Sequence, residues 1–355
     1  MPKTIVIYAS FGHGHKMAAQ ALGKVLDAPV CDLLSFCSPF IGKIYSGLYS
    51  FISHHFRHLW QVTFFLTKTK FISYLVNLLH RALFASLFKY LHREAPDVII
   101  TTHFFPADLA AYIKHEIEFK LISVITDSRV HPLWVNSDID YYFATFEITK
   151  SDLISLGVEA DKIVSGFVPL REGFRSNLSH QELYKQFNLD PLPTVLFVSS
   201  SMGVFPFLKK SLDILLKDFN VFVIYGSNQK LRRYLEGANS ERLRFFPFYE
   251  KIWELIFLSS VIITKPGGMT IFESVHCRKP FIFTHYIPGQ EKENMDVLIE
   301  AGVAKFVKNR RDFLSVVCSL SKKHEQFQNS YPFELKDVQP VLSDLIQNCL
   351  SKDKI

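Results

Sequence analysis

Short apolar runs that end in polar or glycine-containing breaks recur along the N-terminal half of the chain. They are rich in Val and Ile at residues 4–10, 97–103 and 120–126 and in aromatic residues at 141–144, which favours buried strands at all four places. A helical pattern follows the first run at residues 16–26, where Met17, Ala21 and Val25 share one face. Strands that alternate with helices in this way predict a doubly wound α/β sheet.

The second half of the chain opens in the same way as the first. A strand at residues 194–198, a small-residue loop at 199–203, a helix at 207–216 and a strand at 220–226 repeat the pattern. At 355 residues the chain is too long for one ordinary domain. We therefore predict two doubly wound domains, residues 1–175 and 190–335, with a polar connection between them.

Charge is distributed unevenly along the sequence. Residues 33–93 contain no Asp or Glu but seven Lys and Arg, which exceeds the net charge of +6 for the whole chain. Fourteen aromatic residues are interleaved with these cations, and two helices are predicted at 51–66 and 71–91. Basic and aromatic residues on apolar helices suit a membrane surface, whereas nucleic acid favours exposed basic faces with fewer bulky aliphatics. Burial of the same helices in the first domain's core remains an alternative.

The chain carries no signal for export or for crossing a membrane. Its start, MPKTIVIYAS, is too short an apolar run for a signal peptide, and no uncharged run reaches the ~18–20 residues that span a bilayer. Five cysteines without a CxxC pair indicate a reducing compartment. We expect a cytoplasmic protein that associates peripherally with an anionic membrane surface through residues 33–93.

The most informative stretch is residues 264–294. A β-branched strand at 260–264 stops at Pro266-Gly267-Gly268, and the spacing of Thr270 and Glu273 resembles a capping box, which predicts a helix starting at Thr270. A strand, a glycine turn and a helix start form an anion site, because unpaired amides and the helix dipole point the same way. The alternative is an ordinary turn, with Glu273 used only as a cap.

A second strand at residues 280–283 delivers a polar loop, Pro288 to Asn294, which contains Gln290 and Glu291. A phosphate cradle followed by carboxamides and carboxylates matches the requirements of a nucleotide-sugar. The sequence therefore favours a nucleotide-sugar site in the second domain.

These motifs, KPGG-T-x-x-E and P-G-Q-E-x-E-N, resemble the donor-binding motif of the glycosyltransferases that make monogalactosyl- and glucosyl-diacylglycerol. They are more distantly similar to the lipid-linked N-acetylglucosaminyltransferase of peptidoglycan synthesis. The resemblance implies that the glycine turn and helix start hold the diphosphate, Glu273 the ribose, and the Gln-Glu pair the sugar. The implied UDP-sugar residues in this stretch are Gly267, Gly268, Met269, Thr270, Glu273, Gln290, Glu291 and Asn294.

Two further segments are implied to contact UDP. The loop after the first strand of the second domain, Ser201, Met202 and Gly203, would contact phosphate, although relatives have more glycine there. Phe248 and Tyr249 match the place where relatives receive the uracil ring. An aromatic strand end is also common in protein cores, so that alternative stays open.

The first glycine loop, Phe11-Gly12-His13-Gly14-His15, lacks the GxGxxG spacing and the acidic ribose partner of a dinucleotide site. In the resembled family this loop faces the acceptor, and His15 matches the last histidine of a G-x-G-H pattern, with Gly14 beside it. Glycosyl transfer to a hydroxyl needs a base near neutral pH, which a histidine supplies. Capping of the following helix or contact with lipid phosphate are the alternatives for His15.

A second acceptor-side motif follows the third predicted strand. Residues 126–134 resemble the family's T-D-x-x-x-H-x-x-W pattern, which assigns Asp127, His131 and Trp134 to the acceptor side. Asp127 is a second candidate base, or a partner that orients one. No metal site is predicted, because His13-Gly14-His15 lacks further ligands and the D-x-D spacing of Asp138 and Asp140 lacks its usual context.

The resemblance covers most of residues 4–310 and implies two facing Rossmann-like domains of the GT-B type. Residues 166–174 are similar to the family's interdomain turn with one residue inserted, and the last helix, within 336–355, would cross back to the first domain. The implied reaction moves glucose or galactose from UDP to diacylglycerol with inversion. No cofactor is implied, and anionic lipid is expected as an activator. The alternatives are another lipid-linked acceptor or a non-catalytic UDP-sugar sensor.

Overall fold

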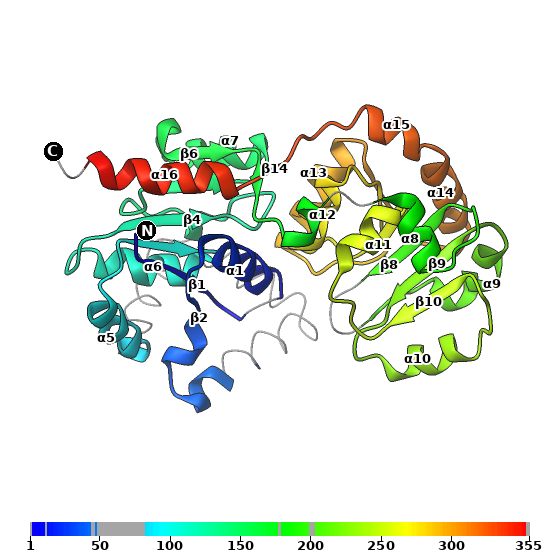
Figure 1. The fold of residues 1–355 in the computed structure, drawn as a ribbon, viewed down its shortest axis with the longest axis horizontal. Helices are drawn as coiled ribbons and strands as arrows, with labels where there is room; N and C mark the ends of the chain where they lie inside the picture. Colours follow the sequence, from blue (N-terminus) through cyan, green and yellow to red (C-terminus); the bar gives the residue numbers. More distant parts are fainter. Residues whose placement is uncertain are drawn as a thin grey trace. The chain divides into compact units, whose positions relative to one another are not determined.

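The computed structural model describes residues 2–10, 13–43, 47, 82–176, 179–198 and 203–352 (Figure 1). Most of the two helices predicted for membrane contact, residues 51–66 and 71–91, lies outside the described residues. Ser201 and Met202, predicted to contact phosphate, lie outside them as well. In the part of the chain that is described, no helix has the length and apolar character needed to cross a membrane.

The chain divides into two compact units. The first comprises Met1–Arg171, Ile287–Glu293 and Leu335–Ile355, and the second comprises Glu172–Tyr286 and Asn294–Glu334. Each unit is built around its own parallel sheet with helices on its faces.

The sheet of the first unit has the strand order β2-β1-β3-β4-β5-β6 over the described residues, with every pair parallel. Its strands are β1 Thr4–Tyr8, β2 Val30–Asp32, β3 Val98–Thr101, β4 Lys120–Val124, β5 Tyr141–Ala144 and β6 Ile163–Ser165. Its helices are α1 His13–Leu26, α5 Ala85–Glu94, α6 Phe104–Ile113, α7 Glu147–Ser155 and α16 Gln339–Lys352, with short 3-10 turns η1 Leu33–Phe36, η2 Pro132–Trp134 and η3 Ala160–Lys162. The order reverses between β1 and β3.

Alternation along β1 explains why this sheet is covered on both faces. Ile5 and Ile7 pack into a core with residues of α5 and α6, whereas Val6 and Tyr8 pack into another core with residues of α1 and α16. Successive side chains of a strand point to opposite faces, so a strand whose five residues are all buried needs two covered faces. Every residue of β1 is buried accordingly.

The sheet of the second unit has the order β10-β9-β8-β11-β12-β13, again parallel throughout. Its strands are β8 Thr194–Val198, β9 Asn220–Ile224, β10 Leu243–Phe246, β11 Val261–Thr264, β12 Phe281–Phe283 and β13 Ala304–Phe306. The helices are α8 His180–Gln186, α9 Leu208–Asp218, α10 Gln229–Glu236, α11 Ile252–Leu258, α12 Gly268–His276, α14 Arg310–Lys322 and α15 His324–Asn329, with η4 Glu172–Arg175 before them. Helix α13, Gln290–Glu300, begins in the first unit and ends in the second. The predicted doubly wound fold is confirmed.

The last helix belongs to the first unit. Strand β14, Lys336–Asp337, pairs in parallel with β7, Phe167–Val168, and α16 follows it directly. Val338, Leu342 and Ile346 are buried in the same core as Val6. Figure 1 shows α16, in red, beside the strands of this first sheet.

Helix α1 starts at His13, three residues before the predicted start, so the end of the predicted glycine loop is helical. Two later helix starts also differ from the predictions. Helix α12 starts at Gly268, not at Thr270, and the extended Gly267 precedes it without a side-chain cap. The buried row of Met269, Ile271, Phe272 and Val275 extends the amphipathic pattern toward the glycines, which accept helical geometry.

The second difference concerns the stretch predicted as a polar loop before Asn294. It is already helical from Gln290, the first residue of α13. Glu291 and Glu293 in its first turn favour this early start, because carboxylates stabilise a helix N-terminus.

Candidate active site

Polar residues gather where the strands of each sheet end at its point of order reversal. In open α/β sheets, ligands bind at this place, just beyond the carboxyl ends of the strands. In the first unit the segments concerned follow β1, β3 and β4, and in the second they follow β8 and β11. The two sets differ in the chemistry that they present.

His15, in the first turn of α1, is fixed by contacts from two neighbouring strand ends. Its Nδ1 lies 2.8 Å from the Thr102 carbonyl oxygen and 2.8 Å from Thr126 Oγ1. A carbonyl only accepts, so its bond to Nδ1 requires the proton on that nitrogen and leaves Nε2 as a proton acceptor. Burial lowers the pKa of His15 to about 4, against an opposing effect of Thr102. His15 is therefore neutral at pH 7 and able to accept a proton.

His103 is a second buried histidine beside His15. The two ring centroids are 4.5 Å apart in an edge-to-face arrangement, and His103 Nδ1 accepts a hydrogen bond from the Phe105 amide at the start of α6. Burial, with a smaller effect of His15, holds the pKa of His103 well below its usual value. Both rings are therefore uncharged at neutral pH, so no charge repulsion disturbs their contact.

Asp127, just past β4, is 6% exposed. Trp134 Nε1 donates a hydrogen bond to its Oδ2 at 3.3 Å, and the Gln290 amide donates to its Oδ1. The pKa of Asp127 is raised to about 7, mainly by burial. The hydrogen bond from Trp134 opposes this shift, and the charge of Glu293 adds to it. A carboxylate that exchanges its proton near neutral pH is suited to general base catalysis.

The other predicted acceptor-side residues have structural partners. His131 is buried and its Nδ1 accepts from the Leu133 amide at 3.2 Å, which caps η2. Trp134 is 1% exposed, lies in the first core and holds Asp127. Gly14 is half-buried in the first turn of α1. Trp134 and His131 thus position the Asp127 segment in this structure.

In the second unit, the turn after β11 leads into the amino end of α12. Gly267 has extended backbone angles, and no side chain caps the helix. The first amides of a helix have no acceptor within it, so those of Gly268, Met269 and Thr270 are available to an anion. A Cβ placed on Gly267 would lie 3.9 Å from Lys265 Nζ, so a cationic group stands beside the turn.

Glu273 and Asn294 are the buried polar residues next to this turn, each 1% exposed. Asn294 Nδ2 donates to the Pro266 carbonyl oxygen at 3.2 Å and so supports the glycine turn from α13. Glu291 Oε2 accepts from the Ile287 amide at 2.8 Å, which fixes the start of α13. Glu273 is thus inside α12, not at its cap.

Gly203 shows why the loop after β8 needs glycine. Its φ is +52°, and an added Cβ would lie 1.9 Å from the Tyr225 carbonyl oxygen. Asn228 Nδ2 donates to the Gly203 carbonyl oxygen at 2.9 Å. The backbone of this loop therefore packs closely on the segment after β9, beside the strand-order reversal.

The two predicted uracil-side aromatics point to different surroundings. Phe248 is 69% exposed, whereas the Tyr249 hydroxyl donates to Glu254 Oε2 at 2.6 Å. Burial and the Glu254 carboxylate raise the pKa of Tyr249, and its ring packs 4.7 Å from that of Phe246. Phe248 has the accessible face that base stacking requires, and Tyr249 has a structural partner.

The aspartates of the D-x-D spacing both have basic neighbours, and Asp140 forms an ion pair. Lys114 Nζ lies 2.5 Å from Asp140 Oδ2, and His115 Nε2 lies 3.4 Å from Asp138 Oδ2. Across the described ranges, no group of three or more His, Cys, Asp or Glu side chains gathers as metal ligands do. Strand β5 begins at Tyr141, so Asp138 and Asp140 lie in the loop before it, as predicted.

Four residues at these sites were given no role by the sequence reasoning: Thr102, His103, Thr126 and Lys265. Each lies within two residues of the end of β3, β4 or β11, and this position is a usable indicator in a doubly wound fold. The contacts of Thr102 and Thr126 with His15 join residues 87 and 111 positions apart, which no local pattern reveals.

Comparisons with known proteins match both halves of the chain. Residues 15–167 match the family described as "Monogalactosyldiacylglycerol (MGDG) synthase", and residues 203–313 match "Glycosyltransferase family 28 C-terminal domain". A "Processive diacylglycerol beta-glucosyltransferase" of Bacillus cytotoxicus is 29% identical over 325 residues, which cover 86% of this chain and 82% of the relative. One of Bacillus cereus (strain ZK / E33L) is 28% identical over 339 residues, or 90% and 86% of the two chains.

Solved structures share the fold at low sequence identity. MurG of Acinetobacter baumannii has a TM-score of 0.61 and 15% identity, with coverage of 98% of this chain and 100% of that one. MnaA of S. aureus, solved with UDP, has a TM-score of 0.61 and 15% identity, with coverage of 99% and 97%. These matches confirm the predicted resemblance and the two-domain, GT-B-type fold.

Proposed function

We infer that this chain, a lipid glycosyltransferase related to the diacylglycerol glycosyltransferases, transfers a hexose from a UDP-sugar to 1,2-diacylglycerol. The product would be a β-glycosyldiacylglycerol. The observation that carries this inference is the glycine turn into α12, where uncapped amides stand beside Lys265 at the sheet's order reversal. The names of the 28–29% identical relatives support diacylglycerol as the acceptor and glucose as the sugar, and the description of the family matched by residues 15–167 supports galactose as the alternative.

In the proposed reaction, the acceptor hydroxyl oxygen attacks C1 of an α-linked UDP-sugar from the opposite side. The C1–oxygen bond to the β-phosphate breaks as the new bond forms, and its electron pair leaves with UDP. Either His15 Nε2 or the Asp127 carboxylate takes the hydroxyl proton. Both can do so, because His15 is neutral at pH 7 and the pKa of Asp127 is about 7.

The second unit would bind the donor and stabilise the leaving group. The amides of Gly268, Met269 and Thr270, with Lys265 beside them, would face the diphosphate as negative charge develops on UDP. Glu273 would bind the ribose, and Gln290 with Glu291 the sugar hydroxyls. UDP-sugar is then a substrate, and no further cofactor enters the proposal.

The membrane role rests on residues 33–93. In its described part, Phe40 is 73% exposed, while Leu33, Leu87 and Leu91 are buried in the first core. The segment thus contributes to the core, and its cations and remaining aromatics are proposed to contact an anionic membrane surface peripherally. Anionic lipid would activate the enzyme by concentrating it at the acceptor.

The experiment is incubation of the purified protein with anionic liposomes that contain diacylglycerol, with UDP-glucose and UDP-galactose offered separately. Mass spectrometry and anomeric NMR would identify the lipid product. We expect a β-glycosyldiacylglycerol from one donor. Absence of product from either donor, with UDP still bound, would reject diacylglycerol as the acceptor and direct the search to another lipid-linked acceptor or to a sensor.

A further inference from the structure

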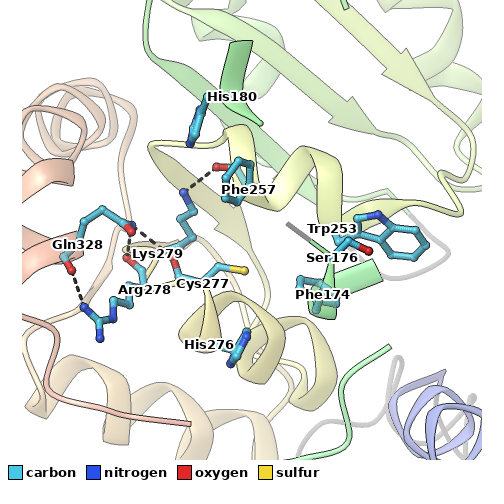
Figure 2. Close-up of a pocket in the computed structure, with 10 residues that line it drawn as sticks. All are labelled: Phe174, Ser176, His180, Trp253, Phe257, His276, Cys277, Arg278, Lys279 and Gln328. Atoms are coloured by element: carbon cyan, nitrogen blue, oxygen red, sulfur yellow. Dashed lines mark hydrogen bonds between the residues drawn. The ribbon is translucent and has the colours of Figure 1, made fainter. Parts of the chain in front are cut away.

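A cavity of about 340 Å³ in the second unit lies apart from the donor turn. Its wall includes the side chains of Phe174, His180, Trp253, Phe257, Arg278 and Lys279 (Figure 2). These residues come from η4, α8, α11 and the segment between α12 and β12. None of them has a part in the reaction proposed above.

The cavity lies at the amino edge of the second sheet. Phe257 is in the helix that precedes β11, and Lys279 is two residues before β12. The glycine turn follows the other end of β11, a four-residue strand that is about 13 Å long. Helix α12 runs from the glycine turn to the cavity, which His276 lines at the helix's last turn. The two places are therefore separate sites.

The charged wall of the cavity has one sign. Among the described residues that line it, His180, His276, Arg278 and Lys279 are basic and none is acidic. Lys279 is 2% exposed, and its ammonium donates a hydrogen bond to the Phe257 carbonyl oxygen at 2.8 Å. Burial lowers the pKa of Lys279 to about 8, and no carboxylate in the described chain opposes this effect. A buried ammonium has three donors and is costly to bury without a counter-charge.

Two histidines adjoin this ammonium. Burial, and then the charge of Lys279, lower the pKa of both His180 and His324, that of His324 to about 4. The buried Nδ1 of His324 has no hydrogen-bond partner within the described structure. Three neighbouring basic groups disfavour one another's charge, and an anion placed among them would reverse that effect.

The wall is held in place before any ligand binds. Gln328 Nε2 donates to the carbonyl oxygens of Cys277 and Arg278 at 3.3 and 3.2 Å, and Arg278 Nη1 donates to the Gln328 carbonyl oxygen at 2.6 Å. The Tyr331 hydroxyl donates to the Lys279 carbonyl oxygen at 2.8 Å. The loop that carries the two cations is thus fixed by the segment after α14, as Figure 2 shows for Gln328.

We propose that this cavity binds a phosphate monoester, with Lys279 and His180 at the phosphate oxygens and Trp253 and Phe174 against the group that the phosphate carries. The Trp253 and Phe174 rings meet edge to face at 6.3 Å and form an apolar wall beside the cations. A soluble phosphorylated metabolite and a lipid headgroup share this chemistry.

The test is calorimetric titration of the full chain, saturated with UDP in a buffer without phosphate, using inorganic phosphate and glycerol 3-phosphate as probes. We expect one site that binds glycerol 3-phosphate more tightly than phosphate. Lys279→Met and His180→Gln should each weaken binding by about tenfold or more, the usual effect of losing a charged hydrogen bond. Lys217→Met, a matched change on exposed α9, should leave binding unchanged.

Saturation with UDP occupies the donor site, so failure here is distinct from failure of the proposed reaction. The proposal is overturned if neither probe binds, if UDP abolishes the binding, or if both cavity variants, shown to be folded by circular dichroism, bind as tightly as the parent. Release of bound glycerol 3-phosphate by phosphatidic acid vesicles, but not by phosphatidylcholine vesicles, would identify a lipid headgroup. If glycerol 3-phosphate stays bound in the presence of either kind of vesicle, the ligand is a soluble phosphate monoester.

Discussion

The two sheets present different chemical groups at the points where their strand order reverses. Beyond β1, β3 and β4 the first unit presents titratable side chains with shifted pKa values, those of His15, His103 and Asp127. Beyond β8 and β11 the second unit presents backbone, through Gly203 and the Gly267–Gly268 turn.

This difference shows how one architecture serves two tasks. Buried side chains have shifted pKa values, which proton transfer requires, whereas uncapped amides offer fixed partial charges without titrating. Disturbing the first unit should therefore change the chemical step, and disturbing the second should change donor binding or stability.

The largest effect is expected for His15→Ala. Removing a general base, or the group that positions one, should lower kcat by about 10²–10⁴-fold, with UDP-sugar affinity nearly unchanged. Steady-state kinetics and calorimetry would measure the two quantities. His115→Ala, in an exposed histidine of the same unit, is the control. Near-normal kcat in His15→Ala would exclude His15 from the chemical step.

The pH dependence of kcat/KM in Asp127→Asn would show whether Asp127 or His15 accepts the proton. Because the pKa of Asp127 is about 7, kcat/KM of the parent should rise with pH through that value, and the variant should lose both this dependence and about 10²-fold or more in rate. A rise centred near 4 would instead assign proton acceptance to His15.

Asp127→Asn should also change how the free energy of unfolding depends on pH. A carboxyl whose folded pKa is raised above its unfolded value near 4 favours folding at low pH, and this contribution is lost as pH rises through about 7. The parent should therefore lose stability across that window relative to Asp127→Asn. Thermal unfolding of both proteins at pH 5 and pH 8 would measure this difference.

Gly203→Ala and Gly267→Ala separate two uses of glycine in the second unit. At Gly203 the backbone is left-handed and a Cβ would collide with the Tyr225 carbonyl, so we expect a loss of about 2–5 kcal/mol in unfolding free energy. At Gly267 a Cβ would meet only the Lys265 side chain, at an ordinary contact distance of 3.9 Å, so the fold should persist while donor binding weakens. Denaturant unfolding and UDP titration would show whether the two effects separate in this way.

Glu273→Ala should weaken UDP-sugar binding by about 10–100-fold, the loss expected for charged hydrogen bonds to the ribose. Glu300→Ala, an exposed glutamate at the end of α13, is the matched control. Calorimetry with UDP-glucose would compare the two variants, and unchanged affinity in Glu273→Ala would remove Glu273 from the ribose role.

The smallest effect is expected for Thr126→Val. It removes one neutral hydrogen bond to His15 Nδ1, which corresponds to about 1 kcal/mol, or roughly fivefold in kcat, with KM for the donor unchanged. Thr145→Val, which removes the hydroxyl of another buried threonine of this sheet, should leave kcat unchanged. Equal effects of the two changes would show that Thr126 acts only through packing.

Periodicity predicted the strands well because each is a buried apolar run. The prediction for the strand at residues 141–144 coincides with β5, and others end within two residues of the observed bounds. Helix starts were less predictable: the spacing of Thr270 and Glu273 indicated a cap, yet the apolar face of α12 places both residues inside the helix.

The candidate site was predictable only in part. The motifs indicated His15 and Asp127, and strand ends are where a doubly wound fold gathers polar groups. The shifts in their pKa values follow from burial, and the partners of His15 come from strands distant in sequence. Such long-range packing has no local pattern, so Thr102 and Thr126 appear only in the structure.

The placement of α16 has a consequence for synthesis on the ribosome. Strand β1 is translated long before Leu342 and Ile346, which pack with Val6 on one face of the first sheet. Most of the second unit is translated before them. This face of the first sheet is thus completed only after the second unit has been translated, and until then α1 covers it without α16.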